Sequence, residues 1–257
     1  MNNQLLSKCP CIYESFVVPD KLTNCFAKRM NLLIVDDSEM VITCLEGFFS
    51  TPFINVSTAT TVDSAFKLIS TPSRQWHCWI IDMNLGNRLN EGLDIIEQNK
   101  SFPFSIIFSG IGSMETAAQA MELGAAEIID KTHDAINKLI LKTCRLMPIS
   151  MLCKGRLQKN RSVFFLLKEN IIKDCHEWAY AANLSLRQLQ NICTLYTGMS
   201  PSYVLPMYYG MQQLLVSSFK QFKHPSEYFE NESFFYACLD FIDQNLPYYQ
   251  TYYHICL

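Results

Sequence analysis

Short apolar runs alternate with helix-like patterns through the first half of the chain. Residues 32–35 form one such run, and an apolar run of this length between polar residues is typical of a strand buried on both faces. Between the runs, apolar residues repeat every three or four positions, as on one face of a helix. The pattern predicts strands at 32–35, 53–58, 78–81, 105–108 and 127–129, and helices near 39–49, 62–70, 92–99, 113–123 and 134–146.

This alternation favours an α/β fold built on a doubly wound, five-stranded parallel sheet. The pattern changes after position 147, where a proline, a glycine and several basic residues predict a linker at 148–162. The remainder shows helical periodicity with turn residues between the segments, and predicts an all-α region. We therefore expect four parts: an extension at 1–30, an α/β domain at 31–147, the linker, and a helical domain at 163–257.

Charge divides the chain in the same way. Residues 31–150 carry 8 Lys and Arg against 14 Asp and Glu, a net charge of −6, whereas residues 151–257 carry 9 against 8, a net charge of +1. The second half therefore lacks the strongly basic surface that non-specific DNA binding favours. No apolar stretch approaches the roughly 20 residues of a membrane helix, and the N-terminus lacks a signal-peptide pattern, so we expect a soluble, cytoplasmic protein.

The 11 cysteines are scattered and show no zinc-ligand spacing. An odd number of cysteines without a secretion signal predicts reduced thiols, most of which fill the core.

Polar residues stand at the ends of the predicted strands. Asp36 and Asp37 follow the first strand, Asp82 follows the third, Ser109 ends the fourth and Lys131 follows the fifth. Because the carboxyl ends of parallel strands meet at one edge of the sheet, we expect these side chains to lie together. Three carboxylates there require a cation, and their hard oxygen atoms suit Mg²⁺. A carboxylate can also attack a phosphoryl group and form an acyl phosphate.

Four motifs in this half resemble those of the receiver domain of two-component response regulators. They are IVDDS (34–38), IIDMNLG (80–86), FSG (108–110) and DK (130–131), and they cover residues 31–147 in the order and at the strand ends found in that family. The resemblance implies a signalling domain rather than an enzyme. It also implies a sensor histidine kinase as the phosphodonor.

The resemblance assigns a role to each residue of the predicted site. Asp82 is then the phosphoacceptor, and Asp37 and Asp82 bind Mg²⁺ directly. Asp36 acts through water, and the backbone carbonyl of Asn84 completes the protein ligands. Ser109 and Lys131 contact the phosphoryl group.

Two positions depart from the family pattern. Thr132 follows Lys131 where the family has a proline, so the usual cis peptide bond is not favoured. Ile128 stands where the family has an aromatic switch residue. An aromatic ring that turns inward therefore cannot report phosphorylation in this chain.

Residues 178–205 show helix-turn-helix organisation in the second half. Asn183 and Leu184 predict a turn, Ser185 is a good N-cap, and Gly198 is expected to end the helix that follows. That helix places polar side chains able to pair with base edges on one side, namely Arg187, Gln188, Gln190 and Asn191. A helical bundle whose polar face meets only water is the alternative that this pattern leaves open.

Residues 171–250 resemble the DNA-binding module of AraC-type transcription regulators, which has two helix-turn-helix units joined by a linker helix. Residues 184–205 match the first unit, and residues 211–219 match the linker helix. Residues 228–247 match the second unit, with departures at Ala237, Asp240 and Gln244. Its acidic residues would be repelled by phosphates, so we expect this unit to fold but to read DNA poorly.

Together the two resemblances imply a phosphorylation-controlled transcription regulator that forms a homodimer when phosphorylated and presents two output modules to DNA. The alternative is a phosphorylation-dependent adaptor whose helical module binds a protein partner. The aromatic run at 248–254 could stack on nucleic acid, although packing on its own domain or on a dimer mate is favoured.

Overall fold

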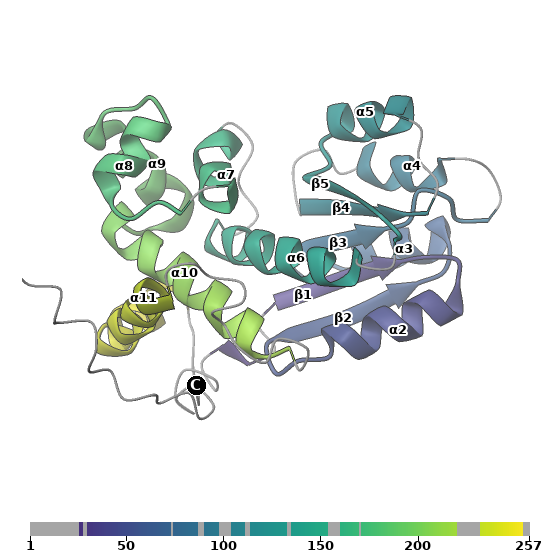
Figure 1. The fold of residues 1–257 in the computed structure, drawn as a ribbon, viewed down its shortest axis with the longest axis horizontal. Helices are drawn as coiled ribbons and strands as arrows, with labels where there is room; N and C mark the ends of the chain where they lie inside the picture. Colours follow the sequence, from purple (N-terminus) through teal and green to yellow (C-terminus); the bar gives the residue numbers. More distant parts are fainter. Residues whose placement is uncertain are drawn as a thin grey trace, which may run out of the picture.

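The structure, a computed structural model, describes residues 26–27, 30–72, 74–86, 90–97, 104–110, 114–132, 135–153, 160–169, 171–219 and 232–253. Nearly all of the predicted extension at 1–30 and residues 154–159 of the predicted linker lie outside these ranges. The described chain forms a sheet covered by helices, with a group of C-terminal helices beside it (Figure 1).

Five parallel strands form one sheet in the order β2-β1-β3-β4-β5. The strands are β1 (Met30–Val35), β2 (Ile54–Ala59), β3 (Cys78–Ile81), β4 (Phe104–Ser109) and β5 (Glu127–Asp130). Every residue of β3 and β4 is buried, as expected for strands covered on both faces. The predicted doubly wound sheet is therefore confirmed, and each strand lies within two residues of its expected limits.

Helices cover both faces of this sheet. They are α2 (Glu39–Phe49), α3 (Val62–Ile69), α4 (Glu91–Glu97), α5 (Met114–Leu123) and α6 (Ala135–Leu152). α2 and α6 share one apolar cluster with one face, whereas α3, α4 and α5 share a second cluster with the other (Figure 1). The first turn of α2 is fixed by Ser38, whose hydroxyl accepts a hydrogen bond from the Val41 amide.

α6 is longer than the sequence pattern predicts. It continues through Leu152, past Pro148, into the stretch expected to be a linker. A proline inside a helix removes a hydrogen bond and is normally a reason to end it. Here Met147, Ile149 and Leu152 are fully buried, so apolar packing compensates for the lost bond.

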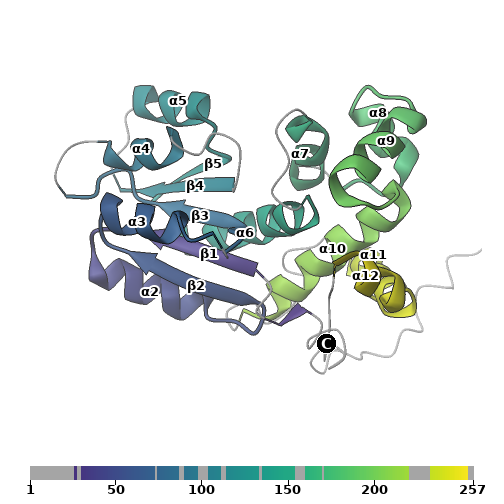
Figure 2. The same cartoon turned by 180° about the vertical axis from the view of Figure 1, so that it is seen from behind.

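The C-terminal helices lie beside the sheet, at the end where its strands begin, and the strand arrows point away from them (Figures 1 and 2). They are α7 (Arg161–Glu169), α8 (Cys175–Ala181), α9 (Leu186–Thr197), α10 (Pro201–Ser217), α11 (Glu232–Gln244) and α12 (Leu246–Tyr253). α10 packs against both α6 and α11, and one apolar cluster runs from the sheet into these helices without a break. The sheet and the C-terminal helices therefore share a core.

The segment from α8 to α9 has the local structure that the sequence predicts. Asn183 has a positive φ of 53° in the turn, and Ser185 is the N-cap of α9 in a capping box with Gln188. Gly198 ends α9 with a φ of 79°, which a residue with a side chain rarely adopts. Pro201 then begins α10.

The region expected to form a second helix-turn-helix unit is described only in part. Residues 220–231 lie outside the described ranges, which includes 228–231 of the predicted unit. α11 and α12 are separated by Asn245 alone, and Ala237, Asp240 and Gln244 are exposed on α11.

The first two residues of the aromatic run, Tyr248 and Tyr249, pack on their own domain, whereas the side chains of 250–254 lie outside the described part of the chain. The ring of Tyr248 stacks on Tyr203 at 4.2 Å, and the hydroxyl of the buried Tyr249 donates to the Tyr203 carbonyl oxygen at 2.9 Å.

Among the described residues, none of the helices combines the length and apolarity needed to cross a membrane. The cysteines in the same part of the chain are free thiols.

Candidate functional site

Four strands bring their ends together at one edge of the sheet. Asp36 follows β1, Asp82 follows β3, Ser109 ends β4 and Lys131 follows β5, and these four strands are neighbours. Backbone hydrogen bonds continue the sheet just past the strand ends: the Asp82 amide donates to Val35 at 2.8 Å, and the Lys131 amide donates to Ser109 at 2.9 Å. The side chains predicted to meet are therefore held by the sheet itself.

The Lys131 ammonium group lies between two aspartates. Its Nζ is 2.6 Å from Asp36 Oδ2 and 2.7 Å from Asp82 Oδ2. The Asp36 side chain is 2% exposed and that of Asp82 is 10% exposed. Two carboxylates this deeply buried would repel each other strongly, because the low local dielectric weakens charge screening. Lys131 supplies the compensating charge from within the chain.

The ionisation of this group reflects both burial and pairing. Burial raises the pKa of the Asp36 carboxyl above its usual value, although hydrogen bonds from Lys131 and from the Ser38 amide oppose the shift. Burial alone would lower the pKa of Lys131, but its hydrogen bonds to Asp36 and Asp82 outweigh that effect and raise it. Lys131 therefore stays charged at neutral pH.

Asp36, Asp37 and Asp82 form a cluster that could hold a cation. Each can offer one oxygen atom, and the three atoms lie within 4.8 Å of one another. Asp37 is exposed, so the cluster is open to solvent on one side. Asp82 Oδ1 is buried and has no hydrogen-bond partner among the described residues. An unpartnered buried carboxylate oxygen is unfavourable unless a further ligand approaches it, and a hard divalent cation fits this donor set.

The remaining predicted site residues lie at the same edge of the sheet. Asn84 is half-buried in the loop after β3, and its side-chain oxygen accepts a hydrogen bond from the Asn90 amide at 3.1 Å. Ser109 is buried at the end of β4. Both residues therefore lie at the edge where the carboxylates meet, and their roles as a metal ligand and a phosphoryl contact stay predictions.

Gly92 is a site residue that the sequence analysis missed. It lies in the first turn of α4, and a Cβ atom there would come within 2.1 Å of the Asp82 backbone oxygen. This close approach lets α4 begin directly against the end of β3. A glycine within a helical pattern is a signal for such packing, and it could have identified the position.

Ile128 and Thr132, the two departures from the family pattern, flank the end of β5. Ile128 is half-buried against the apolar cluster under α3, α4 and α5. Thr132 is exposed, and its amide donates to the Asp130 carbonyl oxygen at 2.8 Å.

Comparisons with known proteins concern this half of the chain. The family model described as the response regulator receiver domain matches residues 32–142. NtrX-like response regulators of Rickettsia are similar in sequence. The protein of Rickettsia conorii is 26% identical over 57% of this chain and 31% of its own length, and that of Rickettsia felis is 29% identical over 46% and 26%. The chain spans about a third or less of the length of these relatives.

Solved receiver domains are also similar to this half. The signal receiver domain of an HD domain-containing protein from Pseudomonas fluorescens covers 46% of this chain and 94% of its own, with 23% identity and a TM-score of 0.40. The beryllofluoride-activated NtrC4 receiver domain covers 47% and 98%, with 23% identity and a TM-score of 0.41.

Proposed function

Residues 32–142 form a response regulator receiver domain, and from this premise we propose that the chain is a two-component response regulator phosphorylated on Asp82. A sensor histidine kinase is the proposed phosphodonor. The C-terminal helices are the proposed output, and they control transcription by binding DNA.

The observation that carries this proposal is the state of the Asp82 carboxylate. One of its oxygen atoms is paired with Lys131, and the other is buried without a hydrogen-bond partner among the described residues. A carboxylate oxygen of Asp82 attacks phosphorus, the bond from phosphorus to the histidine nitrogen breaks, and the nitrogen keeps the electron pair. Asp82 becomes an acyl phosphate.

Neighbouring groups hold the charges during this transfer. Lys131 is close enough to follow the negative charge from the carboxylate to the phosphoryl oxygen atoms, and Ser109 donates a hydrogen bond to one of them. Asp36, Asp37, Asp82 and the Asn84 carbonyl oxygen would hold Mg²⁺. When bound, the ion supplies positive charge for the transferring oxygen atoms.

The proposed DNA contact is the exposed side of α9. Arg187, Gln188, Gln190 and Asn191 are exposed there. Gln188 Oε1 accepts from the Ser185 amide, and Gln190 Nε2 donates to Thr194 Oγ1, so both amides are already used within the helix. Arg187 and Asn191 are therefore the better candidates for base and phosphate contacts.

A second function is supported by the charge of the helical half. Residues 151–257 carry a net charge of only +1, and Asp240 and Gln244 are exposed on α11. A module of this charge suits a phosphorylation-dependent adaptor that binds a protein partner instead of DNA.

Phosphate transfer is tested by intact-mass measurement after incubation with acetyl phosphate and Mg²⁺. The wild-type chain should gain one phosphoryl group, and Asp82→Asn should gain none. Asp130→Asn is the matched control, because it removes an exposed carboxylate at the end of β5. A phosphoryl group that persists in Asp82→Asn contradicts the assignment.

DNA binding is tested by measuring affinity for the chain's own promoter region at several salt concentrations. A regulator shows a steep salt dependence, and Arg187→Ala lowers both the affinity and the slope, the latter by about 1. Lys67→Ala is the control, because it removes one exposed positive charge on α3, in the receiver domain. Salt-independent or absent binding favours the adaptor.

Dimerisation is the proposed step between phosphorylation and output. α5 exposes two large apolar side chains, Met114 at 90% and Met121 at 51%. Light scattering should show a monomer that becomes a dimer with acetyl phosphate and Mg²⁺. A chain that accepts phosphate and stays monomeric contradicts this step.

A further inference from the structure

The ends of β4 and β5 that are remote from the acidic site are covered by α7. Phe165 of α7 lies 5.2 Å from the ring of Phe104, which begins β4. The guanidinium group of Arg161 lies over both rings, at 5.0 Å from Phe104 and 4.6 Å from Phe165. The Arg161 Nε atom is buried and has no hydrogen-bond partner among the described residues, so this contact rests on ring stacking.

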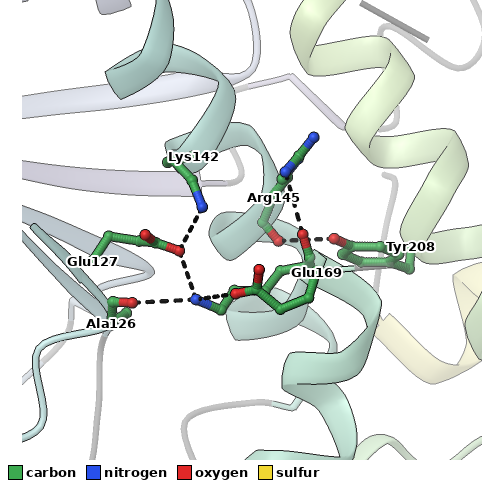
Figure 3. A network of polar contacts seen from close by, with 7 residues as sticks. Ala126, Glu127, Lys142, Arg145, Glu169 and Tyr208 are labelled. Atoms are coloured by element: carbon green, nitrogen blue, oxygen red, sulfur yellow. Dashed lines mark hydrogen bonds and ion pairs between the residues drawn. The ribbon is translucent and has the colours of Figure 1, made fainter. Parts of the chain in front are cut away.

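Lys168, also on α7, reaches the beginning of β5, where it contacts Glu127 and Ala126. Figure 3 shows Glu127 and Ala126 in this network of polar contacts. The Lys168 side chain is only 7% exposed, and its Nζ has three oxygen partners: Glu127 Oε1 at 2.6 Å, Glu169 Oε1 at 2.8 Å and the Ala126 carbonyl oxygen at 3.2 Å. We call these four residues the Lys168 cluster. A buried ammonium group depends on its full set of partners, because losing one leaves charge without compensation.

The Lys168 cluster is connected to the rest of the C-terminal helices. The Lys168 carbonyl oxygen accepts from Arg145 Nη1 at 3.4 Å, and the Arg145 carbonyl oxygen accepts from the Tyr208 hydroxyl on α10 at 3.2 Å (Figure 3). A displacement of α7 therefore also disturbs the contact between α6 and α10.

β5 connects the Lys168 cluster to the acidic site. Glu127 begins the strand, and Lys131 follows its last residue, so the two lie about 13 Å apart in extended chain. Among the described strands, β5 is at the edge of the sheet and pairs with β4 alone. An edge strand of four residues is held by fewer hydrogen bonds than a central strand and can shift along its neighbour more readily.

We propose that β5 transmits phosphorylation of Asp82 to the C-terminal helices, with Lys131 responding at one end and the Lys168 cluster released at the other. This inference rests on the proposed function. The added phosphoryl group carries about −1.5 to −2 charge and lies outside the carboxylate. Lys131 moves outward with this charge, and β5 moves with it in the same direction.

The shift withdraws Glu127 from Lys168, because α7 is fixed by its own apolar contacts. Phe164 and Leu167 of α7 are buried in the apolar cluster that continues into the C-terminal helices, and Phe164 packs on Trp178 of α8. Lys142 of α6 also contacts Glu127 Oε1, at 3.0 Å, but it belongs to the receiver domain and does not hold α7. Phosphorylation therefore loosens α7 from the receiver domain.

Hydrogen exchange of the full chain tests this inference. In the wild-type chain, acetyl phosphate with Mg²⁺ should speed the exchange of α7 amides by about tenfold. Lys168→Met should show the fast exchange before phosphate is added and little further change after it. Lys142→Met is the matched control, because it removes the other lysine that contacts Glu127 Oε1. In this variant the α7 amides should still exchange slowly before phosphate is added and faster after it.

Two further measurements keep the outcome decisive. Glu127→Gln retains the side-chain shape and should reproduce the fast exchange of α7, while slow exchange of β1 amides confirms that each variant is folded. A wild-type chain that gains the phosphoryl mass with no change at α7 overturns the inference and leaves the proposed function standing. A chain that gains no phosphoryl mass overturns the proposed function itself.

Discussion

The two ends of the sheet use charge in opposite ways. At the carboxyl end, Asp36, Asp82 and Lys131 leave one buried carboxylate oxygen without a hydrogen-bond partner among the described residues, and the exposed Asp37 opens the group to solvent. At the other end, Lys168 is almost fully buried and has three oxygen partners.

The difference indicates that the carboxyl end of the sheet is suited to bind a ligand, whereas the other end holds the C-terminal helices in place. An incompletely satisfied buried carboxylate is an energetic cost that a ligand can relieve, so it favours binding and chemistry. A saturated buried cation gains nothing from a further ligand and instead fixes the elements around it. The apolar core that the sheet shares with the C-terminal helices also holds these helices against the sheet.

Trp178→Ala should have the largest effect on stability. Trp178 is fully buried, packs on Phe164 and donates its indole N–H to the Val163 carbonyl oxygen at 2.9 Å. We expect a loss of about 4 kcal/mol in the free energy of unfolding. Because the core is continuous, denaturant unfolding followed at both ends of the sheet should remain one transition. Two separate transitions would contradict the shared core.

Gly92→Ala should disrupt the carboxyl end. The added Cβ would meet the Asp82 backbone oxygen, which cannot move without moving β3. We expect a loss of about 3 kcal/mol and a marked loss of phosphoryl acceptance by intact mass. Gly47→Ala is the control, since a Cβ on that exposed residue of α2 meets nothing within 4 Å. An unchanged Gly92→Ala chain would show that the close approach is not required.

A fall in pH should lower the free energy of unfolding through His77, which lies just before β3 at the end of the sheet where the strands begin. Burial lowers the pKa of His77 to about 4, and its neutral Nδ1 accepts a hydrogen bond from the Asn31 amide at 2.9 Å. A lowered pKa stabilises the fold above pH 6.5, and this contribution is lost as the pH falls toward 4. Chemical denaturation should show a loss of about 2 kcal/mol between pH 7.5 and pH 5. His77→Asn, which keeps an acceptor but does not titrate, should remove most of this dependence.

Lys131→Gln should have the smallest effect on stability and should make it depend on a divalent cation. Without the ammonium group the buried carboxylates of Asp36 and Asp82 repel each other. Burial already raises the pKa of Asp36, so this group can take up a proton, which limits the loss of stability to about 1 kcal/mol. Mg²⁺ should restore stability to this variant more than to the wild-type chain in thermal unfolding. Lys138→Gln, at an exposed position of α6, should show neither effect. If Mg²⁺ stabilised Lys131→Gln and Lys138→Gln equally, a metal at the carboxylates of Asp36 and Asp82 would be contradicted.

The sheet and its acidic edge could be predicted because both depend on local signals. An apolar run such as residues 32–35 identifies a buried strand, and the polar residue after it must lie at the sheet edge in a parallel fold. The strand-end rule also predicted that Lys131 lies near Asp36, although the two are 95 positions apart in the sequence. The direct pairing of Lys131 with both Asp36 and Asp82 could not be predicted, because the order of strands does not determine which side chains form ion pairs.

No comparable sequence pattern predicted that the C-terminal helices pack against the sheet. Pro148 and the basic residues after it predicted a linker, but burial of α6 through Leu152 outweighed the proline. Glu127 and Lys168 look like ordinary surface charges in the sequence, and only the fold brings them together. The length of α6 and the pairing of Glu127 with Lys168 therefore depend on tertiary contacts, which local sequence propensity does not reveal.

The coupling between the acidic site and α7 is tested most directly by measuring it in the opposite direction, from α7 to the site. If occupation of the acidic site loosens α7, then loosening α7 by mutation must favour occupation of the site by the same factor. Titration with beryllofluoride and Mg²⁺ should therefore show tighter binding to Lys168→Met than to the wild-type chain, by about fivefold or more, with Lys142→Met unchanged. Equal or weaker binding to Lys168→Met would contradict the account.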